Sequence, residues 1–145
     1  MDIYTIGFTR KSAREFFDTL RDHGIKRLID VRLNNVSQLA GFSKKDDLEF
    51  FLREILDAEY HHMPLLAPTQ DLLAAYRGKQ IGWEGYADGF RRLVEERRIE
   101  TMLDRKSFET PTVLLCTEPT QDTCHRRLVV EYLDAVWGDV YGVPL

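Results

Sequence analysis

The stretch Thr112-Val-Leu-Leu-Cys116-Thr-Glu118 is a short apolar run that leads into a cysteine, and Pro119-Thr-Gln-Asp122-Thr-Cys124-His125-Arg126 follows it directly. The proline indicates a turn, and the apolar residues after the second cysteine recur with a helical period. The stretch therefore predicts a strand, a loop and the first turn of a helix. Free backbone N–H groups, the positive end of a helix dipole and a guanidinium meet in such a loop, and together they suit an anion.

In the rest of the chain the apolar residues alternate between a strand-like and a helix-like period. Strands are expected over residues 3–7, 26–32, 58–63, 113–116 and 139–143. Helices are expected after Ser12, after Ser43, near 70–76, from Trp83, near Met102 and after Cys124. This alternation predicts an α/β fold, with a mainly parallel sheet of about four to five strands and helices on both faces. For 145 residues we expect a single domain, 1–145.

Three segments carry more detailed signals for helices. Ser12-Ala-Arg-Glu15 matches a capping box at the start of a helix that Gly24 would end. Ser43-Lys-Lys-Asp46 resembles a second helix start of the same kind. Trp83, Tyr86 and Phe90 recur at helical spacing, which indicates a core face, although the first two rings could instead line the wall of a pocket.

The composition, 43% hydrophobic and 30% charged, is that of an ordinary globular protein. A net charge of −4 does not favour nucleic-acid binding, although a local basic patch stays open. No apolar run reaches membrane-spanning length and no signal-peptide pattern is visible, so we expect a cytoplasmic protein with no membrane association. The two cysteines are then expected as reduced thiols. No dinucleotide or Walker fingerprint is present, so the sequence assigns no cofactor. The sequence does not decide the oligomeric state.

Polar residues follow several of the expected strands at their carboxyl ends. They lie at 5–9, 30–32, 61–62 and 116–118. In open parallel sheets, ligands bind beyond this edge, so residues far apart in sequence are expected to converge there. The alternative is that strand ends carry polar residues because turns need them.

The candidate catalytic residues are Cys116, Cys124 and His125. A helix N-terminus and a nearby arginine would favour a thiolate, and Cys124 lies closer to the helix than Cys116, which could simply be a buried strand residue. His125 could act as general acid or base, or could point to solvent. A zinc set of the two cysteines, His125 and one of His61 or His62 is a minority interpretation, because neighbours on a helix diverge by about 100 degrees. We therefore assign no metal.

The candidate binding residues are Arg126, Arg32, Asp30, Glu118, Gly7 and Thr5. An arginine at a helix start opposes the dipole, so local stability does not explain Arg126, whereas an anion or a buried carboxylate would. The structural alternative is an ion pair, either Asp30 with Arg126 or Glu118 with Arg32. Gly7 is expected to allow close backbone approach or a positive φ at the strand end.

Several motifs together resemble the uncharacterised bacterial and archaeal family called domain of unknown function 488. The family has four motifs in a fixed order, and this chain has a counterpart to each. They are a T-I-G-[HF]-S/T opening, a D-V-R strand end, a G-F-S segment and a closing C-x-E…C-H-R signature. The counterparts here are, in the same order, Thr5-Ile6-Gly7-Phe8-Thr9, Asp30-Val31-Arg32, Gly41-Phe42-Ser43, Cys116-Thr117-Glu118 and Cys124-His125-Arg126. The resemblance implies a shared fold and a shared pocket, and it brings no agreed reaction with it.

The chain departs from the family pattern at two places. Many members carry histidine where this chain has Phe8, so a polar group that others have at this position is missing here. Members often have proline and then serine after D-V-R, whereas this chain continues with Leu33-Asn-Asn-Val-Ser37.

These observations lead to three hypotheses. The first is an enzyme or enzyme-like pocket that binds an anionic, phosphate-bearing small molecule or nucleotide through Arg126, Arg32 and the helix start, with the cysteines and His125 as reactive groups. The alternative is a nucleic-acid-associated module that uses the same arginines on phosphates. The third is a structural protein in which the polar cluster only holds the sheet edge together.

Overall fold

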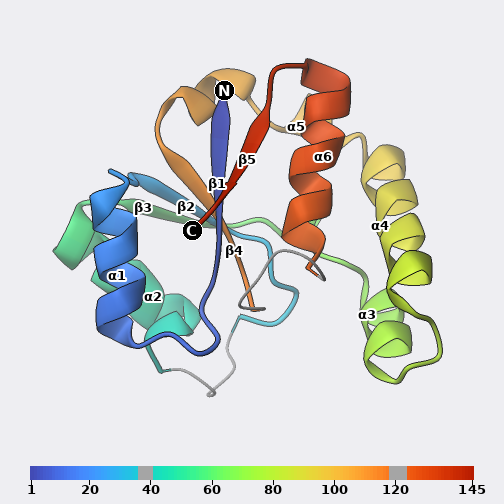
Figure 1. The fold of residues 1–145 in the computed structure, drawn as a ribbon, viewed down its shortest axis with the longest axis horizontal. Helices are drawn as coiled ribbons and strands as arrows, with labels where there is room; N and C mark the ends of the chain where they lie inside the picture. The colour runs from blue at the N-terminus through green and yellow to red at the C-terminus, as the bar shows by residue number, and fades with distance from the viewer. Residues whose placement is uncertain (36–40, 118–123) are drawn as a thin grey trace.

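The computed structural model describes residues 1–35, 41–117 and 124–145 (Figure 1). Its centre is a five-stranded sheet in the order β3-β2-β4-β1-β5, and every neighbouring pair of strands is parallel. The strands are β1 (Asp2–Gly7), β2 (Arg27–Asp30), β3 (Glu59–His62), β4 (Thr112–Cys116) and β5 (Tyr141–Pro144). The expected parallel α/β sheet is confirmed.

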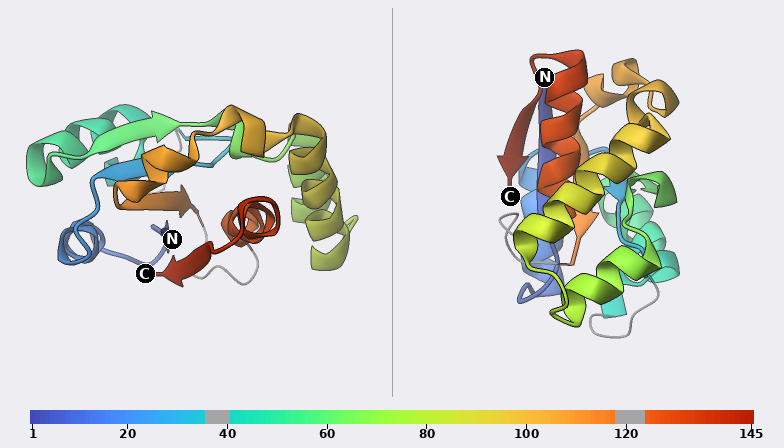
Figure 2. Two further views of the ribbon diagram at one scale, coloured as in Figure 1. Left: turned by 90° about the horizontal axis from the view of Figure 1, so that it is seen from above. Right: turned by 90° about the vertical axis from the view of Figure 1, so that its right-hand side faces the viewer.

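Helices cover both faces of this sheet, as the sequence predicts. They are α1 (Ala13–Asp22), α2 (Lys45–Phe51), α3 (Gln70–Arg77), α4 (Trp83–Arg97), α5 (Ile99–Met102) and α6 (His125–Trp137). In Figure 1, α1 and α2 lie to the left of β1 and β4, and α3, α4 and α6 lie to their right. The two further views show the same layers from above and from the side (Figure 2).

β4 holds the middle of the sheet because it is buried along its whole length. All five of its residues are buried, as expected for a parallel strand covered on both faces. Its alternating side chains divide between two cores: Leu114 packs on the α4 and α6 side, and Val113 packs on the α1 and α2 side. Its register sets Gly7 of β1 opposite Cys116, and Asp30 of β2 opposite Leu115. Three strands therefore end together.

The helix start at Ser12 is confirmed. Ser12 is the N-cap of α1, and its hydroxyl accepts a hydrogen bond from the backbone N–H of Glu15 at 3.1 Å. Gly24, with a φ of +65°, lies just beyond the end of the helix. The cap thus satisfies a backbone donor that the helix itself leaves free.

The expected role of Ser43 as a helix cap is wrong. The N-cap of α2 is Lys44, which makes no side-chain capping bond, and Ser43 belongs to a preceding 3₁₀ turn over Gly41–Ser43. Ser43 is buried, and its carbonyl accepts a hydrogen bond from Arg32. A tertiary contact therefore decides the conformation of this residue. After α2 the chain continues in a π-helical turn over Leu52–Leu56.

α3 is a peripheral helix with no fully buried residue. Tyr76 stacks on Tyr86 of α4, with ring centroids 4.7 Å apart. The loop before α3 is held by Arg97, whose guanidinium donates to the carbonyls of Leu65 at 2.7 Å and Ala67 at 2.6 Å. Both attachments run through α4, so α3 is fixed to that helix and not to the sheet.

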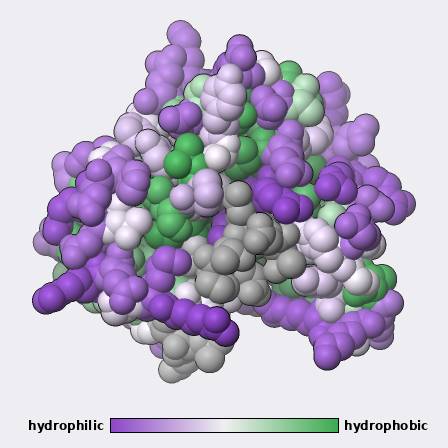
Figure 3. Space-filling view, viewed as in Figure 1, coloured by the Kyte–Doolittle hydropathy of each residue, from purple (hydrophilic) through white to green (hydrophobic). Residues whose placement is uncertain are grey.

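Figure 3 shows one face of the molecule, on which hydrophilic side chains dominate the periphery and apolar side chains gather between them. Within residues 1–35, 41–117 and 124–145, no helix is long and apolar enough to cross a bilayer.

Replacing Ser12 by alanine should destabilise the protein by about 1 kcal/mol, because a capping hydroxyl is lost. Urea unfolding followed by circular dichroism measures this change. Lys44→Ala is the matched control, since it also changes an N-cap residue but removes no capping bond. Equal stability of the parent and Ser12→Ala proteins would contradict the role given to this hydroxyl.

Candidate functional site

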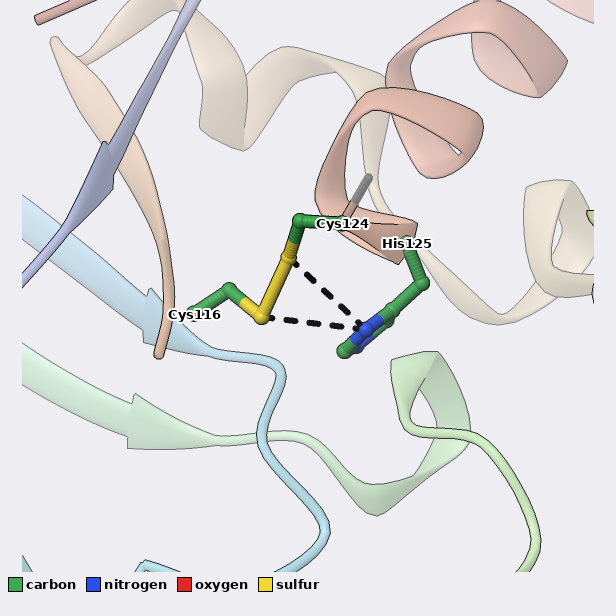
Figure 4. A group of neighbouring side chains, drawn as sticks. All are labelled: Cys116, Cys124 and His125. Carbon is green, nitrogen blue, oxygen red and sulfur yellow. Dashed lines mark hydrogen bonds between the residues drawn. A yellow bond between two sulfur atoms is a disulfide. The ribbon is translucent and has the colours of Figure 1, made fainter. Parts of the chain in front are cut away.

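The carboxyl end of β4 and the start of α6 bring the two cysteines together. Cys116 is the last residue of β4, Cys124 is the N-cap of α6, and a disulfide joins their side chains (Figure 4). The expectation of two reduced thiols is therefore wrong for this state of the protein. Both side chains lie in the core on the α6 side of the sheet.

His125 completes a three-residue cluster. Its Nδ1 lies 3.8 Å from the sulfur of Cys116 and 4.0 Å from the sulfur of Cys124. Its Nε2 lies 2.7 Å from the carbonyl oxygen of Val31, which can only accept a hydrogen bond. The proton of the neutral ring is therefore on Nε2, and Nδ1 presents a lone pair to the sulfurs. Figure 4 shows the ring turned toward both cysteines.

The imidazole is buried, so the expected alternative of a solvent-facing His125 is wrong. Burial is the main cause that lowers its pKa to about 4, and the charge of Arg126 adds to the effect. The hydrogen bond to Val31 acts in the opposite direction. At neutral pH the ring is neutral, and its bare Nδ1 can accept a hydrogen bond from a cysteine thiol once the disulfide is reduced.

The argument that adjacent residues on a helix diverge does not apply to this pair. Cys124 has φ −125° and ψ 139°, which is extended backbone, and only His125 has entered the helix. The helical angle of about 100 degrees between neighbours holds for residues within a helix. As a result, both side chains reach the same point.

Asp30 and Arg32 form a buried ion pair beside this cluster. The guanidinium of Arg32 donates to both carboxylate oxygens of Asp30, at 2.9 and 2.8 Å, and also to the carbonyl of Ser43 at 2.6 Å. The hydroxyl of Tyr60 donates to the same carboxylate at 2.6 Å. The expected pairing of Asp30 with Arg126 is wrong, because Asp30 meets Arg32 two residues further along. Phe8 covers the guanidinium, with its ring centroid 5.3 Å away.

The other sequence candidates lie elsewhere. Arg126 is buried in the first turn of α6, and its charge is felt by Lys11, whose pKa is lowered mainly by burial and then by Arg126. Thr5 is buried within β1, where its carbonyl accepts a bond from the backbone of Leu145. Gly7 lies in strand conformation, so a positive φ, one of its two expected roles, is wrong, and close backbone approach stays a prediction. Glu118 lies outside the described residues.

The two candidate histidines on β3 are also apart from the cluster. His61 is exposed beside Glu59, with 3.2 Å between its Nε2 and the carboxylate. His62 bonds through Nε2 to the carbonyl of Arg32 at 2.8 Å.

A cavity of about 90 Å³ opens onto the cluster. It is lined by Arg32, Leu33, Asn34, Pro68, Leu73, Tyr76, Arg77, Tyr86, Cys116, Thr117, Cys124 and His125. Four of the sequence candidates are therefore brought together here, namely the three cluster residues and Arg32. Asp30 forms an ion pair with Arg32, and neither Asp30 nor Arg126 lines the cavity.

Sequence reasoning missed the far wall of the cavity, which α3 and the start of α4 supply. Tyr76 and Arg77 belong to α3, and Tyr86 belongs to α4. The only signal was the aromatic spacing around Tyr86, which is both buried and cavity-lining, so the two interpretations of that ring hold together. Nothing in the sequence around Arg77 indicates that it meets the cysteines.

The profile of the family described as "Domain of unknown function DUF488" matches residues 12–133. The chain belongs to this family. No curated protein and no solved structure matches this chain. The match includes Asp30, Arg32 and the Cys-His cluster, but it begins after the Thr5–Thr9 motif. Phe8, which lies before the matched residues, packs on the guanidinium of Arg32.

Asp30→Asn should destabilise the protein by about 3–5 kcal/mol, because it leaves the buried guanidinium of Arg32 without its counter-charge. Urea unfolding at neutral pH measures the loss. Asp18→Asn is the matched control, since it removes an aspartate–arginine pair whose side chains are exposed. A similar small effect of both substitutions would show that the buried pair contributes no more than the surface pair.

The stability of the disulfide form should fall as the pH is lowered from 6.5 to 4. His125 has a depressed pKa in the folded protein, about 4 against 6.5, so the unfolded chain binds the extra proton in this window. The full effect is about 3 kcal/mol, present above pH 6.5 and lost toward pH 4. Urea unfolding of the parent and of His125→Asn at several pH values isolates the contribution of His125 to the free energy of unfolding. Parallel pH profiles of the two proteins would contradict it.

Proposed function

We propose that this protein is an enzyme that binds a small phosphate-bearing anion beside Cys116, Cys124 and His125, and that the reduced cysteines are its reactive groups. The observation that carries the proposal is that one cavity is lined by all three cluster residues and by two arginines. Thiols, a bare imidazole nitrogen and cationic groups around one small space are the parts that thiol chemistry on an anion needs.

The charges around the cavity support an anionic ligand. Arg77 is exposed at the end of α3, and no described residue that lines the cavity is acidic. The charge of Arg32 is balanced by Asp30, so Arg32 shapes the cavity more than it attracts an ion. The start of α6 adds the positive end of its helix dipole. Arg77 and α6 together therefore supply the excess positive potential.

The size of the cavity supports a small group. Its volume of about 90 Å³ is well below the roughly 300–1,000 Å³ of sites that enclose whole drug-sized ligands. A phosphate group fits this space, and the rest of a larger ligand would extend outward past Tyr76 and Arg77. We therefore expect recognition of the phosphate group and not enclosure of a complete nucleotide.

The two cysteines have different roles in this proposal. With the disulfide reduced, Cys124 lies at the helix N-cap, where the dipole favours a thiolate. The bare Nδ1 of His125 faces both sulfurs and accepts the hydrogen bond of a thiol. Cys124 is therefore the nucleophile, and Cys116 is the partner that closes the disulfide and removes it.

The nucleic-acid alternative draws no support from these arginines. Arg126 is 1% exposed and Arg32 is 3% exposed, so neither side chain lies where a polymer backbone could reach it. The net charge of −4 points the same way. We therefore make a single proposal, for a small-molecule ligand.

Arg77→Gln should weaken the binding of inorganic phosphate about tenfold, because a charge-assisted hydrogen bond is lost from the mouth of the cavity. Chemical-shift titration of the amide signals of residues that line the cavity measures the affinity. Arg92→Gln is the matched control, as Arg92 is an exposed arginine on α4 that does not line the cavity. A parent protein that shows no phosphate-dependent shifts at the cavity, or equal losses in both variants, would refute the proposal.

A further inference from the structure

We infer that, once the disulfide is reduced, Cys116, Cys124 and His125 bind a zinc ion whose fourth coordination position faces the cavity. The inference goes beyond the proposed anion binding and does not depend on it. Cys124 is a zinc ligand when the ion is bound, and the thiolate chemistry proposed above belongs to the reduced, metal-free form. It rests on the positions of three ligand atoms, on the bond that orients the histidine, and on the spacing of the two cysteine backbones.

The three ligand atoms already lie close to the arrangement that zinc requires. The two sulfurs and a ring nitrogen of His125 are all within 4.8 Å of one another. The nitrogen that faces the sulfurs is 3.8 and 4.0 Å from them. Tetrahedral zinc, with bonds of about 2.3 Å to sulfur and about 2.0–2.1 Å to nitrogen, places sulfur and nitrogen about 3.6 Å apart. Shifts of a few tenths of an ångström therefore suffice on the histidine side.

The histidine is held as a ligand would be. Its Nε2 donates to the carbonyl oxygen of Val31 at 2.7 Å, and its ring packs against Phe90 with centroids 5.1 Å apart. Metal-binding histidines usually donate their second ring N–H to a carbonyl or carboxylate, which fixes the tautomer and aims the free nitrogen at the metal. Here the free nitrogen is aimed at the two sulfurs.

The backbone leaves room for an ion between the cysteines. Their Cα atoms are 7.1 Å apart, which is above the usual disulfide range of about 4.4–6.8 Å. Around zinc the two sulfurs stand about 3.8 Å apart, as tetrahedral angles and sulfur bonds of about 2.3 Å require. The wide spacing of the backbones suits this arrangement without a change in the position of β4 or α6.

The chemistry balances in two steps. A dithiol reductant gives two electrons and two protons to the disulfide, which becomes two thiols, while the reductant becomes a disulfide itself. Zinc then displaces one proton from each thiol and binds two thiolates and the neutral imidazole. The resulting complex has no net charge, which suits ligands that are only 6%, 2% and 5% exposed.

The ligand set selects both the ion and the type of site. Two thiolates and one imidazole form a soft to borderline donor set, which favours zinc over magnesium or calcium. In the described part of the chain, the group contains no fourth protein ligand. All three ligands line the cavity, so the open position is reached from there. Three protein ligands and an open position are typical of catalytic zinc and not of structural zinc.

The test uses Co²⁺ as a spectroscopic substitute for zinc on untagged, reduced protein under argon. We expect one Co²⁺ per chain, a thiolate-to-cobalt charge-transfer band and the intense visible bands of a tetrahedral site. Added Zn²⁺ should abolish these bands, and the disulfide form should show none of them. Reduced parent protein that shows no charge-transfer band would overturn the inference.

Variants identify the ligands. Cys116→Ser and His125→Gln should lose or strongly change the charge-transfer and visible bands, whereas His61→Gln should keep the parent spectrum. The His61→Gln substitution is a suitable control because it removes an exposed imidazole from β3. If a variant does not fold, a second experiment on the reduced parent protein takes its place. In that experiment Zn²⁺ should slow the alkylation of both cysteines by iodoacetamide, as measured by mass spectrometry. Unchanged alkylation of either cysteine would also overturn the inference.

The two proposals fail separately. Inorganic phosphate added to the Co²⁺ form should shift the visible bands if it reaches the open position. Tetrahedral bands that do not respond to phosphate would support the metal site and count against phosphate binding at it. Phosphate-dependent amide shifts in a protein that binds no Co²⁺ would support phosphate binding and refute the metal site.

Discussion

The buried pair of Asp30 and Arg32 is the constraint on which the site depends. Two charges in the interior are tolerated only when their hydrogen bonds are satisfied, and here Tyr60 of β3 and the carbonyl of Ser43 complete them. The pair thereby joins β2, β3 and the turn before α2, and it fixes the backbone just after β2. The carbonyl of Val31, between the two charges in sequence, orients His125. The position of the imidazole beside the sulfurs thus follows from an ion pair of which only Arg32 lines the cavity.

Sequence reasoning was most accurate where one local pattern decided the outcome. The apolar run before Cys116 is β4, and Ser12 caps α1 as expected. Prediction from the sequence failed where a contact with a distant residue decides the structure. The carbonyl of Ser43 accepts a hydrogen bond from Arg32, and the N-cap of α2 is Lys44 and not Ser43. The last strand begins at Tyr141 and not at Asp139, whose positive φ places it in the turn before the strand. Local patterns do not contain this tertiary information.

The Cys-His cluster shows how a shift of one residue changes a conclusion. The expected helix did begin at this point, yet Cys124 is its N-cap with extended backbone. The two neighbours therefore converge instead of diverging, and the objection to a shared ligand no longer applies. Boundaries are the least certain part of any assignment from sequence, and here one boundary carries the chemistry. The orienting partner of His125 was also invisible to motif reasoning, because it is a main-chain carbonyl, which any residue at position 31 supplies.

The attachment of α3 has a consequence for how this fold changes during evolution. The helix carries Tyr76 and Arg77 at the mouth of the cavity, yet it buries no residue fully and is joined to α4 by a ring stack. Insertions and replacements in such a peripheral segment disturb the sheet little, because few core contacts depend on them. Relatives could thus exchange this wall and acquire new ligand preferences, while the cysteines and the histidine keep their positions on the sheet edge. Diversity in ligand choice would then be found between Pro64 and Gly82, and uniformity at the ends of β2 and β4.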